Sequence, residues 1–171
     1  MSASRKGTPK SSKGTKNYWC PHAGKIWAVG EFQSEDKAKK TIKLSVKEDK
    51  TVSDYPIDAC VFIEDNSIIT EAVDDLTSLS QVNDATILNC SRIRFDNSII
   101  YTSIGAVLMA VNPFERIEGL YGRANITKYH WDSRDANIAP HIYLTPAGAY
   151  KAMASFGKNQ SLIISGESGA G

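Results

Sequence analysis

The chain has 171 residues, a formal net charge of +1, 42% hydrophobic residues and 23% charged residues. This composition is typical of soluble globular proteins and excludes collagenous, disulfide-rich and wholly disordered chains. The longest apolar run, residues 104–111, is far shorter than the roughly 20 residues that cross a bilayer, so we expect no transmembrane segment. The N-terminus has no secretory signal pattern, and the chain is therefore expected to be cytoplasmic.

The N-terminal segment is strongly basic. Five Lys or Arg residues and no acid lie within residues 1–16, so the rest of the chain is net negative. Small polar residues and proline separate the basic ones, and no large apolar side chain is present to offset the entropy lost on ordering. We predict a disordered basic tail over residues 1–17. It is either a solvated extension or a weak electrostatic contact for an anionic surface.

Residues 18–70 contain short segments of β pattern separated by charged connectors. Apolar and polar residues alternate over residues 25–32 and 41–46, and two further segments follow at 51–57 and 60–63. We predict four or five antiparallel strands that form a small barrel or sandwich. Cys20, Cys60 and Cys90 contain no C-x-x-C pair, which favours free thiols over disulfides or a metal site.

Longer elements follow residue 70. Helical spacing predicts a helix over residues 84–94, with Asn83 or Asp84 as its N-cap. Two β-rich runs follow at residues 99–102 and 106–111, with a turn at 103–105 between them. The second run is apolar on both faces, as in a strand that is covered on both sides of a sheet.

The region 115–140 is predicted to be loop with a short helix near 123–130. A further helix is expected to begin at Thr145 as N-cap, with Pro146 at the first helical position and Gly157 as a left-handed stop. Its apolar side comprises Ala147, Tyr150, Met153 and Ala154. The nearby His141 has no serine, cysteine or carboxylate grouping that would make it catalytic, so we interpret it as structural.

A glycine-rich segment ends the sequence. A predicted strand at residues 162–164 runs into Gly166, Glu167, Ser168, Gly169, Ala170 and Gly171. A phosphate-binding loop has the pattern G-x-x-x-x-G-K-[ST], in which glycines let backbone N–H groups surround a phosphate. Gly166 and Gly171 fill its two glycine positions, and the lysine and hydroxyl positions come after them. The spacing alone is equally compatible with an ordinary turn.

The segment NQSLIISGESGAG, residues 159–171, resembles the phosphate loop of the myosin motor family. The resemblance continues, in the family's order, in DDLTSLSQVNDATIL at 74–88, IYTSIGAVLMAVNPF at 100–114 and APHIYLTPAGAYKAM at 139–153. It implies that residues 71–171 are the start of an α/β P-loop NTPase core, truncated within the P-loop motif. Residues 18–70 resemble the small SH3-like β-barrel that precedes the motor core in many myosins.

The resemblance also implies a nucleotide site. The backbone of residues 166–171 would surround the phosphates, and the purine side would be formed by Asn112, Pro113, Phe114, Arg116 and Tyr121. This chain departs from the family at Glu115, which is commonly basic, and at Glu118-Gly119, which replace a proline and lengthen the stretch by one residue. No catalytic or metal-ligating residue is assigned.

The implied function is that of an actin-based motor that hydrolyses ATP with Mg²⁺, located in the cytoplasm at the cytoskeleton. Actin, and light chains if present, would bind through regions outside these residues, and no nucleic-acid partner is expected. The 171 residues alone are expected to be inactive, because the lysine, the Mg²⁺ ligands and the switch segments come after Gly171. The alternatives are a different P-loop nucleotide-binding protein and a non-enzymatic, barrel-type interaction module.

Overall fold

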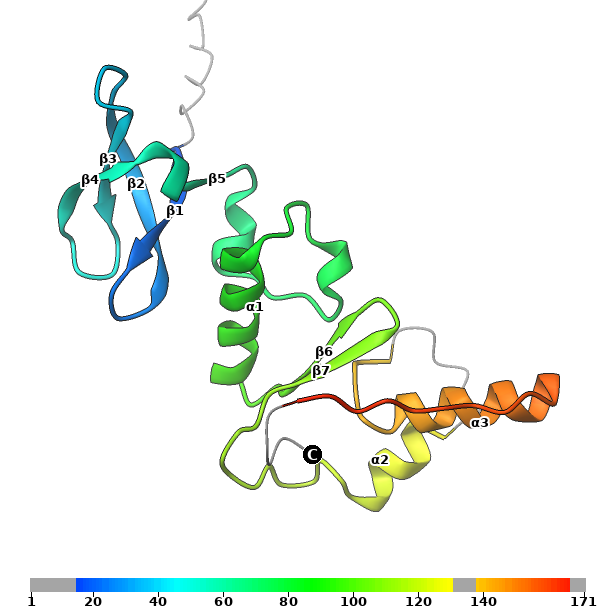
Figure 1. Ribbon diagram of the computed structural model, residues 1–171. Coiled ribbons are helices and arrows are strands. Elements are labelled where there is room, and N and C mark those ends of the chain that lie inside the picture. The colour runs from blue at the N-terminus through cyan, green and yellow to red at the C-terminus, as the bar shows by residue number, and fades with distance from the viewer. Residues whose placement is uncertain (1–14, 131–137, 167–171) are drawn as a thin grey trace, which may run out of the picture. The chain divides into compact units, whose positions relative to one another are not determined.

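The computed structural model describes residues 15–130 and 138–166 (Figure 1). It contains two compact units, Met1–Asn66 and Ser67–Gly171, whereas the sequence placed the boundary after residue 70. Most of the predicted basic tail lies outside the described residues. Asn17, which we included in the tail, is already part of the first strand.

The first unit is a five-stranded antiparallel sheet with the strand order β4-β3-β2-β1-β5. The strands are β1 (Asn17–His22), β2 (Ile26–Asp36), β3 (Thr41–Val46), β4 (Val52–Pro56) and β5 (Val61–Ile63), and a 3-10 turn, Ile57–Ala59, joins the last two. The prediction for 41–46 is confirmed. β2 is longer than predicted because a register shift between Phe32 and Ser34 lets its pairing with β3 continue to Asp36.

Strand β1 was not predicted. It contains Pro21, which normally argues against a strand in the middle of a sheet. In the structure β5 pairs with β1 only at residues 17–19, so Pro21 pairs with Trp27 of β2 beyond the end of β5. Proline is tolerated where one side of a strand lacks a neighbour, which explains how this strand forms.

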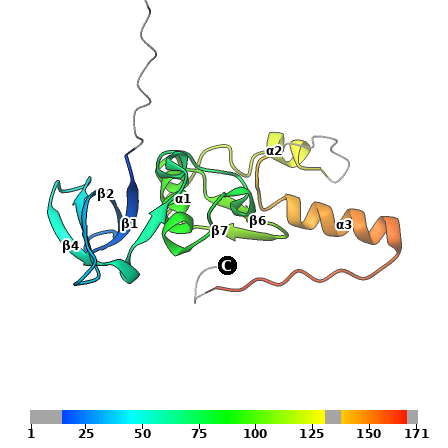
Figure 2. The same ribbon diagram turned by 90° about the horizontal axis from the view of Figure 1, so that it is seen from above.

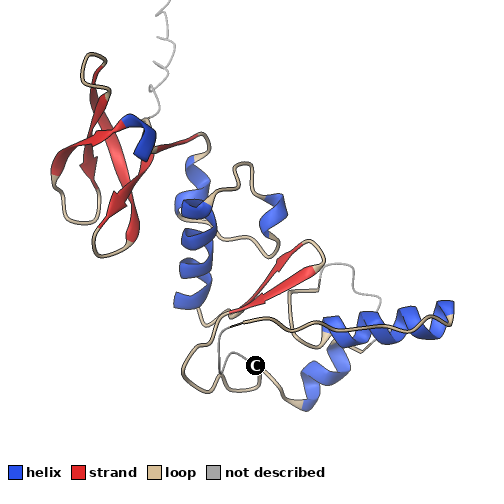
Figure 3. Cartoon of the chain, viewed as in Figure 1, coloured by secondary structure: helices blue, strands red, loops and turns tan. Residues whose placement is uncertain are grey.

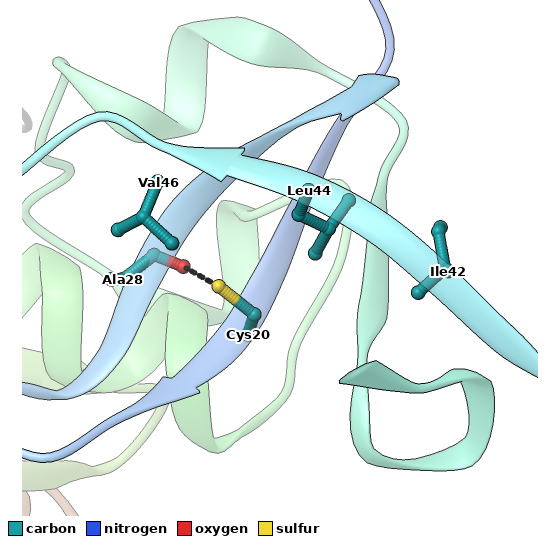
Figure 4. Packing of buried hydrophobic residues seen from close by; sticks show 5 residues of the cluster. All are labelled: Cys20, Ala28, Ile42, Leu44 and Val46. Atoms are coloured by element: carbon teal, nitrogen blue, oxygen red, sulfur yellow. Dashed lines mark hydrogen bonds between the residues drawn. The ribbon is translucent and has the colours of Figure 1, made fainter. Parts of the chain in front are cut away.

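One cluster of buried residues in the first unit lies on one face of the sheet. Figure 4 shows its members, which are Cys20, Ala28, Ile42, Leu44 and Val46. The Cys20 thiol donates a hydrogen bond to the Ala28 carbonyl at 3.5 Å. Burial raises the pKa of the Cys20 and Cys60 thiols to about 11, so both stay protonated at neutral pH. All three cysteines are free, as predicted.

The second unit combines short helices with a β-hairpin (Figure 3). Its elements are the 3-10 helix Leu76–Ser78, α1 (Asp84–Asp96), β6 (Tyr101–Ile104), β7 (Val107–Ala110), α2 (Arg123–Lys128) and α3 (Leu144–Phe156). The predicted helices at 84–94 and 123–130 are confirmed with small shifts of their ends. In the described part of the chain, no helix is long and apolar enough to span a membrane.

Helix α1 begins with a capping box. The Asn83 side chain accepts a hydrogen bond from the Thr86 backbone N–H at 3.0 Å, and the Thr86 hydroxyl accepts one from the Asn83 N–H at 3.0 Å. This reciprocal pair satisfies two donors that the first turn leaves without helical partners. Asn83, rather than Asp84, is therefore the N-cap.

The hairpin differs from its prediction in two ways. Ile104 pairs with Val107, so the turn consists of Gly105 and Ala106 rather than residues 103–105, and Gly105 has the positive φ of 58° that this turn requires. The prediction that the second strand is covered on both faces is wrong for the described structure, because Val107 of β7 is 64% exposed. An apolar pattern on both faces shows that a strand could be buried on both sides, but burial also requires neighbouring elements that cover it.

Helix α3 begins earlier than predicted. Its N-cap is Tyr143, whose carbonyl accepts the Ala147 N–H at 3.2 Å, so Thr145 lies inside the first turn and is not the N-cap. Gly157 ends the helix with a φ of 63°, as predicted. Two residues on the predicted apolar side, Tyr150 and Met153, are 51% and 44% exposed.

The chain after α3 is extended but is not a strand (Figure 2). The strand predicted at residues 162–164 is therefore wrong for the described structure, and Ile163 is 91% exposed. A strand needs backbone hydrogen bonds from a neighbouring strand. No strand within residues 15–130 and 138–166 pairs with this segment.

Replacing Gly30 with alanine should destabilise the first unit. A Cβ atom at this position would lie 2.8 Å from the Cβ and 2.9 Å from the Cδ1 of Leu44, and such overpacking costs about 1–3 kcal/mol. Gly24→Ala is the matched control, because its nearest neighbouring atom, in His22, is 3.5 Å away. Hydrogen exchange of the β1–β3 amides should accelerate in Gly30→Ala alone; equal protection in both variants would contradict this packing.

Candidate functional site

A cavity of about 500 Å³ lies in the second unit, beside the segment that follows β7. It is lined by Ile100, Pro113, Glu115, Arg116, Ile117, Glu118, Gly119, Leu120, Tyr121 and Gly122. Its volume falls in the range of small-molecule sites. The structure thus brings three of the five predicted purine-side residues, Pro113, Arg116 and Tyr121, to one cavity.

The other two predicted purine-side residues do not line the cavity. The Asn112 side-chain oxygen accepts the Phe114 N–H at 2.8 Å and so shapes the turn after β7. Phe114 has a φ of 52°, which is uncommon for a residue with a side chain, and is 89% exposed. Asn112 therefore positions the backbone, and the Phe114 ring faces solvent.

Glu118 and Gly119, at which the sequence departs from the family pattern, both line the cavity. Gly119 has a φ of 76°, which favours glycine, and its carbonyl accepts the Gly122 N–H at 3.1 Å. The Asn125 side chain of α2 donates to the carbonyls of Gly119 and Leu120 at 3.0 and 2.8 Å. Gly119 thus forms a left-handed turn that leads directly into α2.

Tyr121 is held by two other tyrosines. Its hydroxyl forms a 2.8 Å hydrogen bond with the Tyr101 hydroxyl of β6, and its carbonyl accepts the Tyr143 hydroxyl at 3.2 Å. Burial, followed by the bond to Tyr121, raises the pKa of Tyr101, which therefore stays protonated. These bonds fix the Tyr121 backbone and the end of its side chain.

His141 lies beside Tyr121 and is only 2% exposed. Its Nδ1 accepts the Tyr143 N–H at 3.1 Å, so the ring proton is on Nε2 and is donated to the Leu120 carbonyl at 3.0 Å. The Tyr129 ring stacks on it with a centroid distance of 4.5 Å and an interplanar angle of 18°. Both ring nitrogens are occupied, which agrees with the structural role inferred from the sequence.

The buried Arg94 connects three segments of this unit. Its Nη1 donates to the Val73 carbonyl at 2.9 Å and to the Asp74 carboxylate at 2.8 Å, and its Nη2 donates to the Tyr101 carbonyl at 2.7 Å. The Asp74 side chain is 61% exposed, so solvent weakens the ion pair. The buried carbonyls are therefore the more important partners, and sequence reasoning did not single out this arginine.

Asp75 holds the hairpin turn. Its carboxylate accepts hydrogen bonds from the Thr77 N–H at 2.9 Å, the Thr77 hydroxyl at 2.8 Å and the Gly105 N–H at 3.1 Å. The bonds from Thr77, and then that from Gly105, hold the pKa of Asp75 below its usual value. The two aspartates of DDLTSL thus have separate structural roles.

The predicted phosphate loop is only partly described. Gly166 is exposed and lies in the extended segment after α3. Glu167, Ser168, Gly169, Ala170 and Gly171 lie outside the described residues. Within the described ranges, no group of three or more His, Cys, Asp or Glu residues is placed to hold a metal ion.

The sequence matches the myosin head (motor domain) family over residues 73–171. The chain belongs to this family. It is 36% identical over 170 residues to Myosin-4 of Saccharomyces cerevisiae, 39% over 153 to Myosin-2 of Arabidopsis thaliana and 36% over 159 to unconventional myosin-Vb of Homo sapiens. These alignments cover 92%, 90% and 90% of this chain, and 11%, 12% and 8% of the respective relatives. The chain thus spans about a tenth of the length of these myosins.

The myosin family assignment confirms the resemblance on which the site residues were chosen. The family match begins at residue 73, where the Arg94 guanidinium binds the Val73 carbonyl. The hydrogen bonds that support the cavity, from Arg94 to His141, all lie within the matched myosin region.

Replacing Arg94 with methionine should destabilise the second unit by about 3 kcal/mol, because the buried carbonyls of Val73 and Tyr101 lose their donor. Urea unfolding and hydrogen exchange at Ser103, whose N–H bonds to Asp74, would measure the effect. Arg116→Met is the matched control, since the Arg116 side chain is 88% exposed. Equal stability of the two variants would show that the buried guanidinium is dispensable.

Proposed function

We propose that this chain forms the nucleotide-binding start of a myosin motor that hydrolyses ATP with Mg²⁺ and moves on actin. The observation that carries the proposal is the cavity lined by residues 113–122, which gathers Pro113, Arg116 and Tyr121 in a chain of the motor-domain family. The glycine-rich residues 166–171 supply the second half of the expected site.

The cavity fits the purine side of a nucleotide in size and in chemistry. Pro113 and Tyr121 offer a rigid ring and an aromatic face, and Ile100 and Leu120 add apolar surface for a flat base. Arg116 supplies hydrogen-bond donors at the rim. Its contact with Glu118, 3.5 Å between Nε and Oε1, joins two side chains that are more than 85% exposed, so a ligand can replace it at little cost.

The backbone N–H groups of residues 166–171 would hold the phosphates, and the lysine and hydroxyl positions of the motif follow Gly171. Mg²⁺ bound with ATP neutralises charge on the transferring phosphoryl group. In this scheme the described residues bind and orient the base, and they donate or accept no proton during hydrolysis.

The first unit is proposed to be the SH3-like barrel of the motor, without a catalytic role. Its support is the meander β1–β4, followed by a 3-10 turn that returns the chain to pair β5 with β1. We further propose a cytoplasmic, cytoskeleton-associated location, with actin and light chains bound through regions outside residues 1–171. The basic tail remains a prediction of weak contact with anionic surfaces.

Two alternatives make different predictions. A different P-loop protein would bind ATP without stimulation by actin, and the family match over residues 73–171 disfavours it. A non-enzymatic interaction module would bind a protein or an anionic lipid through the first unit alone, and the cavity would have no ligand.

The 171-residue chain should not bind Mg·ATP measurably, because its phosphate loop lacks the lysine and hydroxyl positions. Isothermal titration of the purified chain with Mg·ATP tests this expectation. A dissociation constant in the micromolar range would contradict it, since phosphate contacts supply much of the affinity at such loops.

A longer protein that continues past the phosphate loop should bind Mg·ATP, and actin should stimulate its hydrolysis. Tyr121→Ala should weaken binding by about tenfold through loss of the aromatic wall. Tyr150→Ala, which alters a half-exposed tyrosine on α3, is the control and should leave binding unchanged. Unchanged affinity in Tyr121→Ala would remove the base from this cavity, and ATP hydrolysis without actin stimulation would favour another P-loop class.

A further inference from the structure

His141 is a buried titratable residue that no step of the proposed function uses. It does not line the cavity, but it contacts the loop 119–122 that does. Its Nε2–H donates to the Leu120 carbonyl at 3.0 Å, and the Tyr143 hydroxyl, two residues along the chain, donates to the next carbonyl, that of Tyr121, at 3.2 Å. Consecutive carbonyls of the cavity loop are thus bound from one short segment before α3.

We propose that neutral His141 is a positioning residue that fixes the cavity loop 119–122, and that protonation of its ring releases this loop. The release follows from hydrogen-bond geometry. Nδ1 accepts the Tyr143 N–H at 3.1 Å, and a protonated Nδ1 would place a second donor against that N–H. The imidazolium can therefore keep its bond to Leu120 only if the ring, or the segment carrying Tyr143, moves.

The surroundings of the ring also oppose its charged form. Within residues 67–130 and 138–166, the titratable rings around it are Tyr101 in β6, Tyr121 in the loop, Tyr129 after α2 and Tyr143 before α3, with centroid distances of 5.2, 6.1, 4.5 and 4.6 Å. Among the described side chains, the charged group that acts on the ring is the Lys128 ammonium, which repels an imidazolium.

Burial, and to a smaller extent Lys128, lowers the pKa of His141 below its usual value of 6.5, although the bond to Leu120 partly opposes this shift. At a pH above the usual value, the His141 ring is neutral in both the folded and the unfolded state, and its two hydrogen bonds in the folded state are complete. As the pH falls below the usual histidine pKa, the unfolded state takes up a proton more readily than the folded state. The free energy of unfolding therefore decreases between the usual pKa and the lower pKa of His141 in the folded protein. The loop should therefore be ordered at neutral pH and loosened under mild acid.

If the cavity binds the base of ATP, the affinity for ATP should fall at mildly acidic pH, and this consequence rests on the proposed function. The contact between His141 and the loop does not, because it is a property of the chain without a ligand. The test is therefore made on the 171-residue chain with no nucleotide. Its failure leaves the ATP proposal intact, and failure of ATP binding in the longer protein leaves this proposal intact.

The first experiment is a ¹⁵N NMR titration from about pH 7.5 to about pH 5 that follows the His141 ring and the amides of the loop. We expect the Nε2–H tautomer at neutral pH, and amide shifts at Gly119, Leu120 and Gly122 that follow the protonation of His141. An imidazolium at neutral pH, or loop amides that ignore the titration, would overturn the proposal. This experiment uses the unaltered chain, so it decides even if a variant fails to fold.

The second experiment compares two variants at one neutral pH. His141→Phe keeps an aromatic ring but removes both ring hydrogen bonds, and Tyr129→Phe keeps the stacked ring and both of them. The amide of Gly122, which bonds to the Gly119 carbonyl at 3.1 Å, should exchange about tenfold faster in His141→Phe and at the original rate in Tyr129→Phe. The loop in His141→Phe should also lose its pH response. Unchanged Gly122 protection in His141→Phe would overturn the positioning role.

Discussion

The second unit depends on the burial of one positive charge. Arg94 is 3% exposed, and burying a charge is costly unless hydrogen bonds and an opposite charge compensate it. The carbonyls of Val73 and Tyr101 and the Asp74 carboxylate accept from its two terminal nitrogens, and they come from the two segments that pack beside α1. The Arg94 Nε is buried and has no hydrogen-bond partner among the described groups. Because a guanidinium presents its donors in a fixed plane, it sets the position of β6 relative to residues 73–74 as well as satisfying its own charge.

This constraint reaches the cavity through β6. The carbonyl of Tyr101 binds Arg94, and the hydroxyl of the same residue binds Tyr121 in the cavity loop. Tyr143 and His141 hold the same loop from the segment before α3. The cavity wall is therefore supported from two directions by polar contacts between buried or half-buried groups. Such contacts fix geometry more strictly than apolar packing does.

What could be predicted from the sequence were the features set by local hydrogen bonds or backbone preferences. The Asn83 cap and the Gly157 stop depend on residues within one helical turn, and both were found. Thr145 failed as a cap because α3 starts at Leu144, after Tyr143, which is the N-cap without a side-chain capping bond. The strand predicted at residues 162–164 failed because a strand requires hydrogen bonds to a neighbouring strand.

Within the candidate site, the family motif led to Pro113, Arg116 and Tyr121. It gave no sign of Arg94, since an arginine in a helix is usually a surface residue.

Two buried side chains of this unit, Arg94 and His141, respond differently to pH. An arginine stays charged at every pH a protein meets, so the junction of α1 with β6 keeps its hydrogen bonds under acid as well as neutral conditions. A histidine can exchange its role as acceptor for that of donor within the physiological range. The permanent charge of Arg94 lies where α1 meets β6 and residues 73–74, and the His141 ring lies against the cavity loop. Because the pH-sensitive contact is the one between His141 and the cavity loop, the loop can respond to pH while the Arg94 hydrogen bonds between α1 and β6 remain.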